Sequence, residues 1–135
     1  MSTRDVNRAL YLALHNEPGL EALGVSGAWD TQAPENTPLP LVIYFKSDGQ
    51  HVYTLKRRAW EDLSFTIKGI ARDNKDLAER IDNRLYAVLN RQQLPLDNGY
   101  MMILQRETDL SYTEKDGGAT FYHVGGIYTV MVRDG

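Results

Sequence analysis

The side chains that could carry acid–base or metal chemistry are few and scattered. The three histidines, His15, His51 and His123, stand far apart, and none has another histidine or a carboxylate at the spacing of metal ligands. The chain has no cysteine, which excludes disulfides and thiolate metal sites. We therefore predict no metal site, no cofactor and no catalytic residue.

The other motifs of catalysis are missing as well. The glycine pair Gly125-Gly126 falls inside a predicted strand rather than before a helix, so it does not form a phosphate-binding loop. No serine has the context of a nucleophile elbow. Neighbouring acids such as Glu61 and Asp62, or Glu79 and Asp82, are expected on solvated faces.

One enzymatic alternative stays open, built on the scattered polar residues His123, Tyr122 and Glu107. A site of this kind requires the three side chains to meet in a pocket with perturbed titration. A structure that holds them apart would remove it.

The basic run Lys56-Arg57-Arg58, followed closely by Trp60, is the strongest local charge feature. Such a run is typical of a solvated strand edge that discourages aggregation. Arginine beside tryptophan is also the composition of interface hot spots, and a basic run can contact an acidic partner surface or passing nucleic acid. A small nucleic-acid-associated module that uses this run is therefore an alternative function. Trp29 lies in a polar loop, either as an anchor on the core or as an exposed interface residue. The candidate interface residues are therefore Trp29, Lys56, Arg57, Arg58 and Trp60.

Length and composition fit one globular domain, 1–135. The chain has 135 residues, of which 42% are hydrophobic and 24% charged, and its formal net charge is -3. This acidity argues against a dedicated nucleic-acid binder, which is usually basic. The N-terminus lacks the apolar core of a signal peptide, and no apolar run approaches the length of a bilayer span. We expect a soluble protein that stays in the cytoplasm of its producing cell or is assembled there.

Two helices carry the clearest periodicity. The first is expected over residues 3–16, ended by Pro18-Gly19. The second begins after Asp73, a predicted N-cap, and its apolar residues recur at helical spacing. These residues are Leu77, Ala78, Ile81, Leu85, Val88 and Leu89.

Four strands are expected around these helices, over residues 39–46, 63–68, 100–108 and 121–132. Residues 26–38 read as a loop, 47–49 as a turn and 113–118 as a hairpin loop. Residues 51–59 could form a projecting strand, a hairpin arm or a loop, and Gly125-Gly126 indicates a bulge or a close backbone approach. The prediction is an α+β fold: a mainly antiparallel four-stranded sheet with two helices packed on one face, plus an extended arm or hairpin.

The order of these elements resembles a known family. It runs from an N-terminal helix through a proline-rich loop to Leu39-Pro40-Leu41-Val42-Ile43-Tyr44, followed by Gly49 to Leu55. Then come Trp60 to Ala71, a helix with Leu77-Ala78 and Leu85, and the closing segment His123 to Tyr128. This pattern is similar to that of the tail-completion, or tail terminator, proteins of long-tailed bacteriophages and related gene-transfer particles.

The resemblance implies a structural role rather than catalysis. It implies a homohexameric ring in the virion, at the head-proximal end of the tail tube, where it stops polymerisation of the tube protein and presents a surface to a head-completion or connector protein. DNA would be only a passing cargo in the lumen, and no membrane would be involved. The segment from Gly49 to Trp60 would be a candidate contact arm, and residues 30–38 a candidate head-side or tube-side surface.

Overall fold

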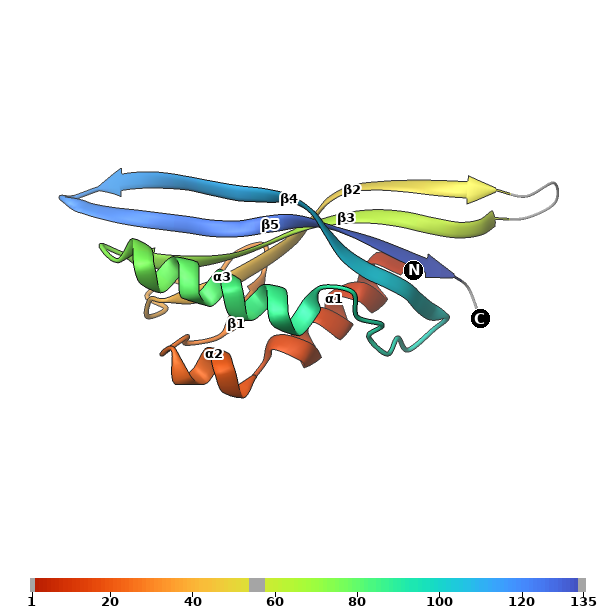
Figure 1. Ribbon diagram of the computed structural model, residues 1–135, viewed down its shortest axis with the longest axis horizontal. Coiled ribbons are helices and arrows are strands. Elements are labelled where there is room, and N and C mark those ends of the chain that lie inside the picture. Colours follow the sequence, from red (N-terminus) through yellow and green to blue (C-terminus); the bar gives the residue numbers. More distant parts are fainter. Residues whose placement is uncertain (1, 54–57, 134–135) are drawn as a thin grey trace.

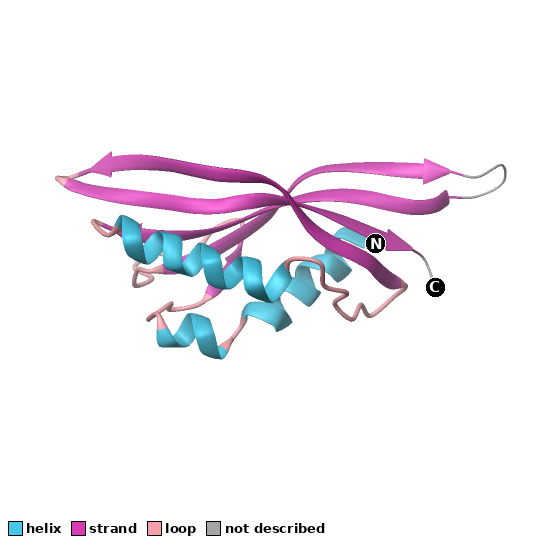
Figure 2. Cartoon of the chain, viewed as in Figure 1, coloured by secondary structure: helices cyan, strands magenta, loops and turns pink. Residues whose placement is uncertain are grey.

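The computed structural model describes residues 2–53 and 58–133, with the side chains of residues 3–47 and 60–133. Within these residues the fold is α+β: helices lie along one face of a five-stranded sheet, and the other face carries no helix (Figures 1 and 2). The elements are α1 (Ser2–Leu14), α2 (Pro18–Ala22), β1 (Ala28–Asp30), β2 (Leu41–Tyr53), β3 (Arg58–Arg72), α3 (Lys75–Leu89), β4 (Tyr100–Asp116) and β5 (Ala119–Arg133).

The sheet has the order β1-β2-β3-β5-β4, so the prediction of four strands is wrong by one. The additional strand, β1, lies inside the predicted loop 26–38 and pairs in parallel with residues 42–44 of β2. All other pairs are antiparallel, as expected. Three residues are too few to show an alternating pattern, which is why the sequence does not reveal β1.

The strands are longer than predicted, and two expected irregular segments belong to them. Residues 47–49 do not end the strand, because β2 passes through them with a register shift between Lys46 and Asp48 and stays paired with β3. Similarly, β4 continues through the predicted loop to Asp116, and the tight turn is Gly117-Gly118, both with positive φ. The β2–β3 and β4–β5 hairpins extend to opposite ends of the molecule (Figure 1). Of the uncertain segment 51–59, residues 51–53 belong to β2 and residues 58–59 to β3, and residues 54–57 lie outside the described residues.

The close backbone approach predicted at Gly125-Gly126 is confirmed, but a bulge there is wrong. Pairing of β3 with β5 runs through both glycines without a shift. A Cβ on Gly125 would overlap the carbonyl oxygen of Ile67 and the Cα of Lys68. In the pairing of β4 with β5, the register shifts lie in β4, around Met102 and Glu107.

The apolar stripe of α3 is confirmed, whereas its predicted cap is not. Asn74 is the N-cap, and its side-chain oxygen accepts from the backbone N–H of Leu77. Asp73 has φ 52° and instead accepts, through its carboxylate, the backbone N–H of Thr120 at 2.8 Å. The side chain that looked like a cap therefore fastens the β3–α3 turn to β5.

The predicted first helix, 3–16, is confirmed as α1, and the short helix α2 that follows it is a third helix that the prediction of two helices lacks. The helix α1 ends at Leu14, and Pro18-Gly19 opens α2 rather than ending a helix. Proline is favoured at a first helical position because the missing N–H has no partner there in any case. Glu17 caps α2, accepting from the backbone N–H groups of Gly19 and Leu20 at 3.1 Å each.

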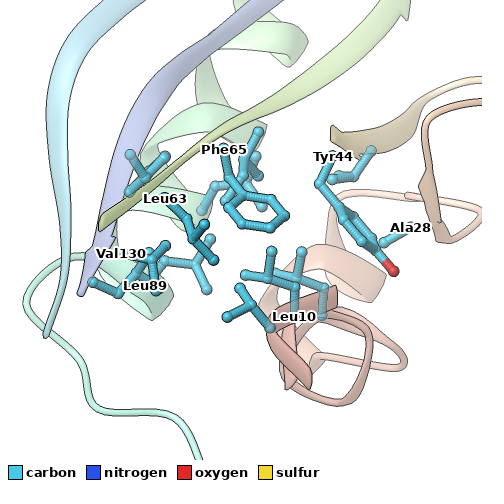
Figure 3. Close-up of a cluster of buried hydrophobic side chains, with 14 of the residues drawn as sticks. Leu10, Ala28, Tyr44, Leu63, Phe65, Leu89 and Val130 are labelled. Carbon is cyan, nitrogen blue, oxygen red and sulfur yellow. The ribbon is translucent and has the colours of Figure 1, made fainter. Parts of the chain in front are cut away.

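The core lies between the helices and the sheet (Figure 3). Leu63 and Phe65 of β3 point into it, together with Val130 of β5, and they meet Leu10 of α1 and Leu89 of α3. Each of these side chains is almost completely buried. This layer is what makes α1 and α3 cover one side of the sheet.

The sheet face that turns away from the helices is here called the open face. Alternation along the strands places on it Trp29 of β1, Leu41, Ile43 and Phe45 of β2, Thr66, Lys68 and Ile70 of β3, and His123 of β5. Leu41, Ile43, Thr66, Lys68 and His123 are buried although no helix covers them. Residues 41–44 of β2 are therefore buried, with side chains on both faces of the sheet, and Phe45 is half-buried.

Candidate functional site

Of the predicted interface residues, the two whose side chains are described, Trp29 and Trp60, lie apart. Trp29 is half-buried on the open face of β1, and Trp60 is half-buried on the outer part of β3. Trp29 lies beside Ile43 in the sheet, and Ile43 lies opposite Lys68. Trp60 is eight residues from Lys68 along β3, so the two tryptophans are separated by roughly 26 Å along the strand direction. Lys56 and Arg57 lie outside the described residues, as does the side chain of Arg58.

The enzymatic alternative is not supported by the geometry. Tyr122 and His123 are neighbours in β5, so their side chains point to opposite faces of the sheet. Glu107 is exposed at an irregular point of the edge strand β4. The three side chains share no pocket. No group of metal-binding residues occurs in the described part of the chain.

His123 belongs to a different cluster, on the open face, with Lys68, Tyr112, Glu114 and Phe45. Lys68 Nζ donates a hydrogen bond to the Tyr112 hydroxyl at 2.5 Å, and it lies 4.9 Å from the centre of that ring and 5.9 Å from that of Phe45. Tyr112 also stacks on His123, with ring centres 4.4 Å apart. Four strands, β2, β3, β5 and β4, bring these residues together.

The imidazole of His123 is held between a cation and an anion. Burial lowers the pKa of His123, Lys68 lowers it further, and Glu114 acts in the opposite direction. The neutral ring is therefore favoured, with Nε2 2.5 Å from Glu114 Oε1 as the donor. The other nitrogen, Nδ1, is buried and has no hydrogen-bond partner among the described residues.

Two adjoining hollows lie over this cluster. A groove of 260 Å³ has Lys68, Phe45 and Ile43 in its lining, with Thr31, Gln32 and Ala33 of the segment after β1. A second hollow of 360 Å³ reaches Glu114 and His123. Both include Ala33, Leu41 and Ile70 in their linings. The groove is thus mainly apolar, and Lys68 is the one lysine in its lining.

A second polar cluster lies on the helix-facing side of the sheet. The Nη2 of Arg106 in β4 is 2.9 Å from Asp82 Oδ2 in α3, and the guanidinium also donates to the carbonyl of Gly125. Its plane lies near the rings of Tyr86 and Tyr128. Burial raises the pKa of Tyr128 to about 12. This cluster joins α3 to the far edge of the sheet and is structural.

Of the acids predicted on solvated faces, Glu61 is buried and Asp82 is half-buried. Asp82 faces Arg106, with 14% of its side chain exposed. Glu61 faces the helix side of β3 and is 7% exposed. The sequence offers no sign of either burial, because the partner of Asp82 lies 24 residues away and is set by the β4 register.

No family model matches this sequence, and the comparison with curated proteins gives no match. Among solved structures, the chain is similar to one in the structure described as "Virion of native gene transfer agent (GTA) particle", with a TM-score of 0.80. The superposition covers 96% of each chain at 16% sequence identity. The two chains share one fold. None of the described helices has the length and apolar character that a membrane crossing needs.

Proposed function

We propose that this chain is a structural virion protein that closes the head-proximal end of a phage-type tail tube as a homohexameric ring. In this role it stops polymerisation of the tube protein and offers a surface to a head-completion or connector protein. The observation that carries the proposal is the likeness, over 96% of both chains, to a component of a gene transfer agent virion. The family pattern in the sequence points in the same direction.

The shape of the molecule suits a ring. A closed ring needs a heterologous interface, in which one patch of a subunit meets a different patch of its neighbour. The two hairpins at opposite ends of the sheet provide two such different surfaces (Figure 1). Edge strands β4 and, beyond Tyr44, β2 can accept a strand from another subunit.

The charge of the chain suits a lumen through which DNA passes. A net charge of -3 disfavours tight binding of the phosphate backbone. Arg58 and Trp60 are in β3, Lys56 and Arg57 directly precede them in the sequence, and Trp29 lies on the open face. We keep these residues as proposed contacts with the tube protein or a neighbouring subunit.

The decisive experiment measures assembly and capping together. Native mass spectrometry of the purified protein over a wide concentration range should find six copies, alone or on tail tubes. Added during polymerisation of the tube protein, the chain should shorten the tubes seen by negative-stain microscopy, with tube protein alone as the control. A chain that stays monomeric at every concentration and leaves tube length unchanged would contradict the proposal.

A further inference from the structure

Lys68 is a buried cation without a buried counter-charge. It lies in the middle of β3, the central strand, and is only 8% exposed on a face that no helix covers. Its ammonium bonds the neutral Tyr112 hydroxyl, and no carboxylate forms a salt bridge with it in the part of the chain that the structure describes. The one carboxylate of the cluster, Glu114, bonds His123 instead. Burying a charge in this way is costly unless a partner compensates it.

The surroundings of Lys68 indicate which group would compensate it. The groove over Lys68 is lined by Leu41, Ile43, Phe45 and Ile70, so a carboxylate entering it would meet one cation in an apolar setting. A charge-assisted hydrogen bond from an ammonium to a carboxylate is strong in such a setting.

The groove also adjoins an unpaired strand edge. Pairing with β1 ends at Tyr44, and from Phe45 onward the outer edge of β2 has no strand partner among residues 2–53 and 58–133. A strand added to this edge would send alternate side chains toward the open face, beside Phe45 and over the groove. The edge and the groove therefore form one continuous surface.

We propose that this surface is a subunit contact, in which a second copy of the chain places a carboxylate against Lys68. This proposal rests on the ring function and specifies one of its contacts. A second copy fits because the chain carries an excess of acids, 18 Asp and Glu against 15 Lys and Arg, and because the groove continues the edge that a neighbouring subunit would occupy. Because Lys68 is already buried in the subunit, its ammonium is in position for the partner carboxylate.

The test compares K68M with the matched control K75M. Methionine keeps the unbranched shape of lysine and removes the charge, and Lys75 is an exposed lysine on the helix side, at the start of α3. At concentrations where the protein is monomeric, K68M should melt at or above the wild-type temperature, because an unpaired buried charge has been removed. Self-association of K68M should weaken by about 30-fold or more, with K75M unchanged.

A zero-length carbodiimide cross-link identifies the contact directly. Rings formed from mixed ¹⁴N and ¹⁵N protein should give hybrid cross-linked peptides that join Lys68 of one copy to an Asp or Glu of another. Rings that assemble without this product, and with K68M as tight as wild type, would overturn the Lys68 contact and leave the ring function standing. Absence of any assembly in the wild type would overturn both.

Discussion

Arg106 shows, at the scale of single residues, how the two layers of the molecule are joined. Its guanidinium bonds Asp82 of α3 and the Gly125 carbonyl, and it lies over Tyr86 and Tyr128. Gly126 makes room for it, because a Cβ there would overlap the guanidinium. An arginine with 9% of its side chain exposed needs carboxylate partners; Asp109 is one but is exposed, so Asp82 is the main counter-charge.

We therefore expect Asp82→Asn to destabilise the fold by about 3 kcal/mol, since it leaves Arg106 buried without its main counter-charge. Urea unfolding at pH 7 measures this. Asp76→Asn is the matched control, because Asp76 lies in the same helix and pairs with an arginine on the surface. That change should cost less than about 1 kcal/mol. Equal effects of the two substitutions would contradict the structural role given to Asp82.

Gly125 carries a second residue-scale prediction. Gly125→Ala would force its Cβ against the backbone of Ile67 and Lys68, which cannot move without opening the β3–β5 ladder. We expect a loss of at least about 2 kcal/mol in the free energy of unfolding. The control is Gly117→Asn in the hairpin turn, where nothing crowds the added side chain and asparagine tolerates the positive φ. A Gly125→Ala protein as stable as this control would show that the strands are not closely apposed there.

At the scale of elements, the short helix α2 is stabilised by its N-cap, Glu17. The carboxylate of Glu17 accepts from two backbone N–H groups, and its Oε1 is 2.6 Å from Arg84 Nε of α3. The hydrogen bond from Arg84 lowers the pKa of Glu17 below its ordinary value of 4.5. Glu17 thus caps α2 and, through Arg84, holds it against α3.

The pH dependence of stability follows from that lowered pKa. The stabilisation by ionised Glu17 is complete above its unfolded-state pKa, near 4.5, and is lost as the pH falls through the lower folded-state value. Glu17→Gln should therefore be less stable than wild type at pH 7, and the difference should shrink below pH 4.5. Chemical unfolding across this range measures it, with the exposed Glu79→Gln as a control for net charge. A difference that does not change with pH would contradict the cap.

The helix α3 supports the sheet through one apolar stripe. Leu85 in its middle is fully buried against the core. Leu85→Asp places a carboxylate there, and we expect a loss of more than about 4 kcal/mol and no soluble expression. Asn83→Asp, on the exposed side of the same helix, adds the same charge and should express normally. A Leu85→Asp protein that melts like wild type would refute the packing of α3.

At the scale of the whole molecule, the fold leaves one sheet face without helices and two hairpins at its ends (Figure 2). If the native state assembles into a ring, mass action stabilises it against unfolding. The apparent melting temperature should then fall by about 4 °C or more on a 100-fold dilution of the wild type. K68M should show little such dependence, whereas K75M should behave as wild type. A melting temperature independent of concentration in all three would argue against self-association.

The sequence by itself determined the elements whose signal is local. The apolar stripe of α3 and the alternation of Leu63, Phe65 and Ile67 can be recognised from residues close together in the sequence. These two patterns predicted the α+β class and the buried layer. The adjacent glycines Gly125 and Gly126 likewise predicted a close approach of two backbones. Local patterns of this kind follow from the periods of helix and strand, which need no partner to be recognised.

Only the tertiary structure decided what depends on distant partners. The three-residue strand β1 exists because β2 pairs with it, and residues 47–49 stay extended because β3 holds them. The cluster of Lys68, Tyr112 and His123 joins positions up to 55 residues apart, since Lys68 and His123 meet only through the register of β3 on β5. From the sequence alone, each of these side chains could be assigned only to a strand and to one face of the sheet. The register alone placed a lysine, buried and without a carboxylate, at the floor of an apolar groove.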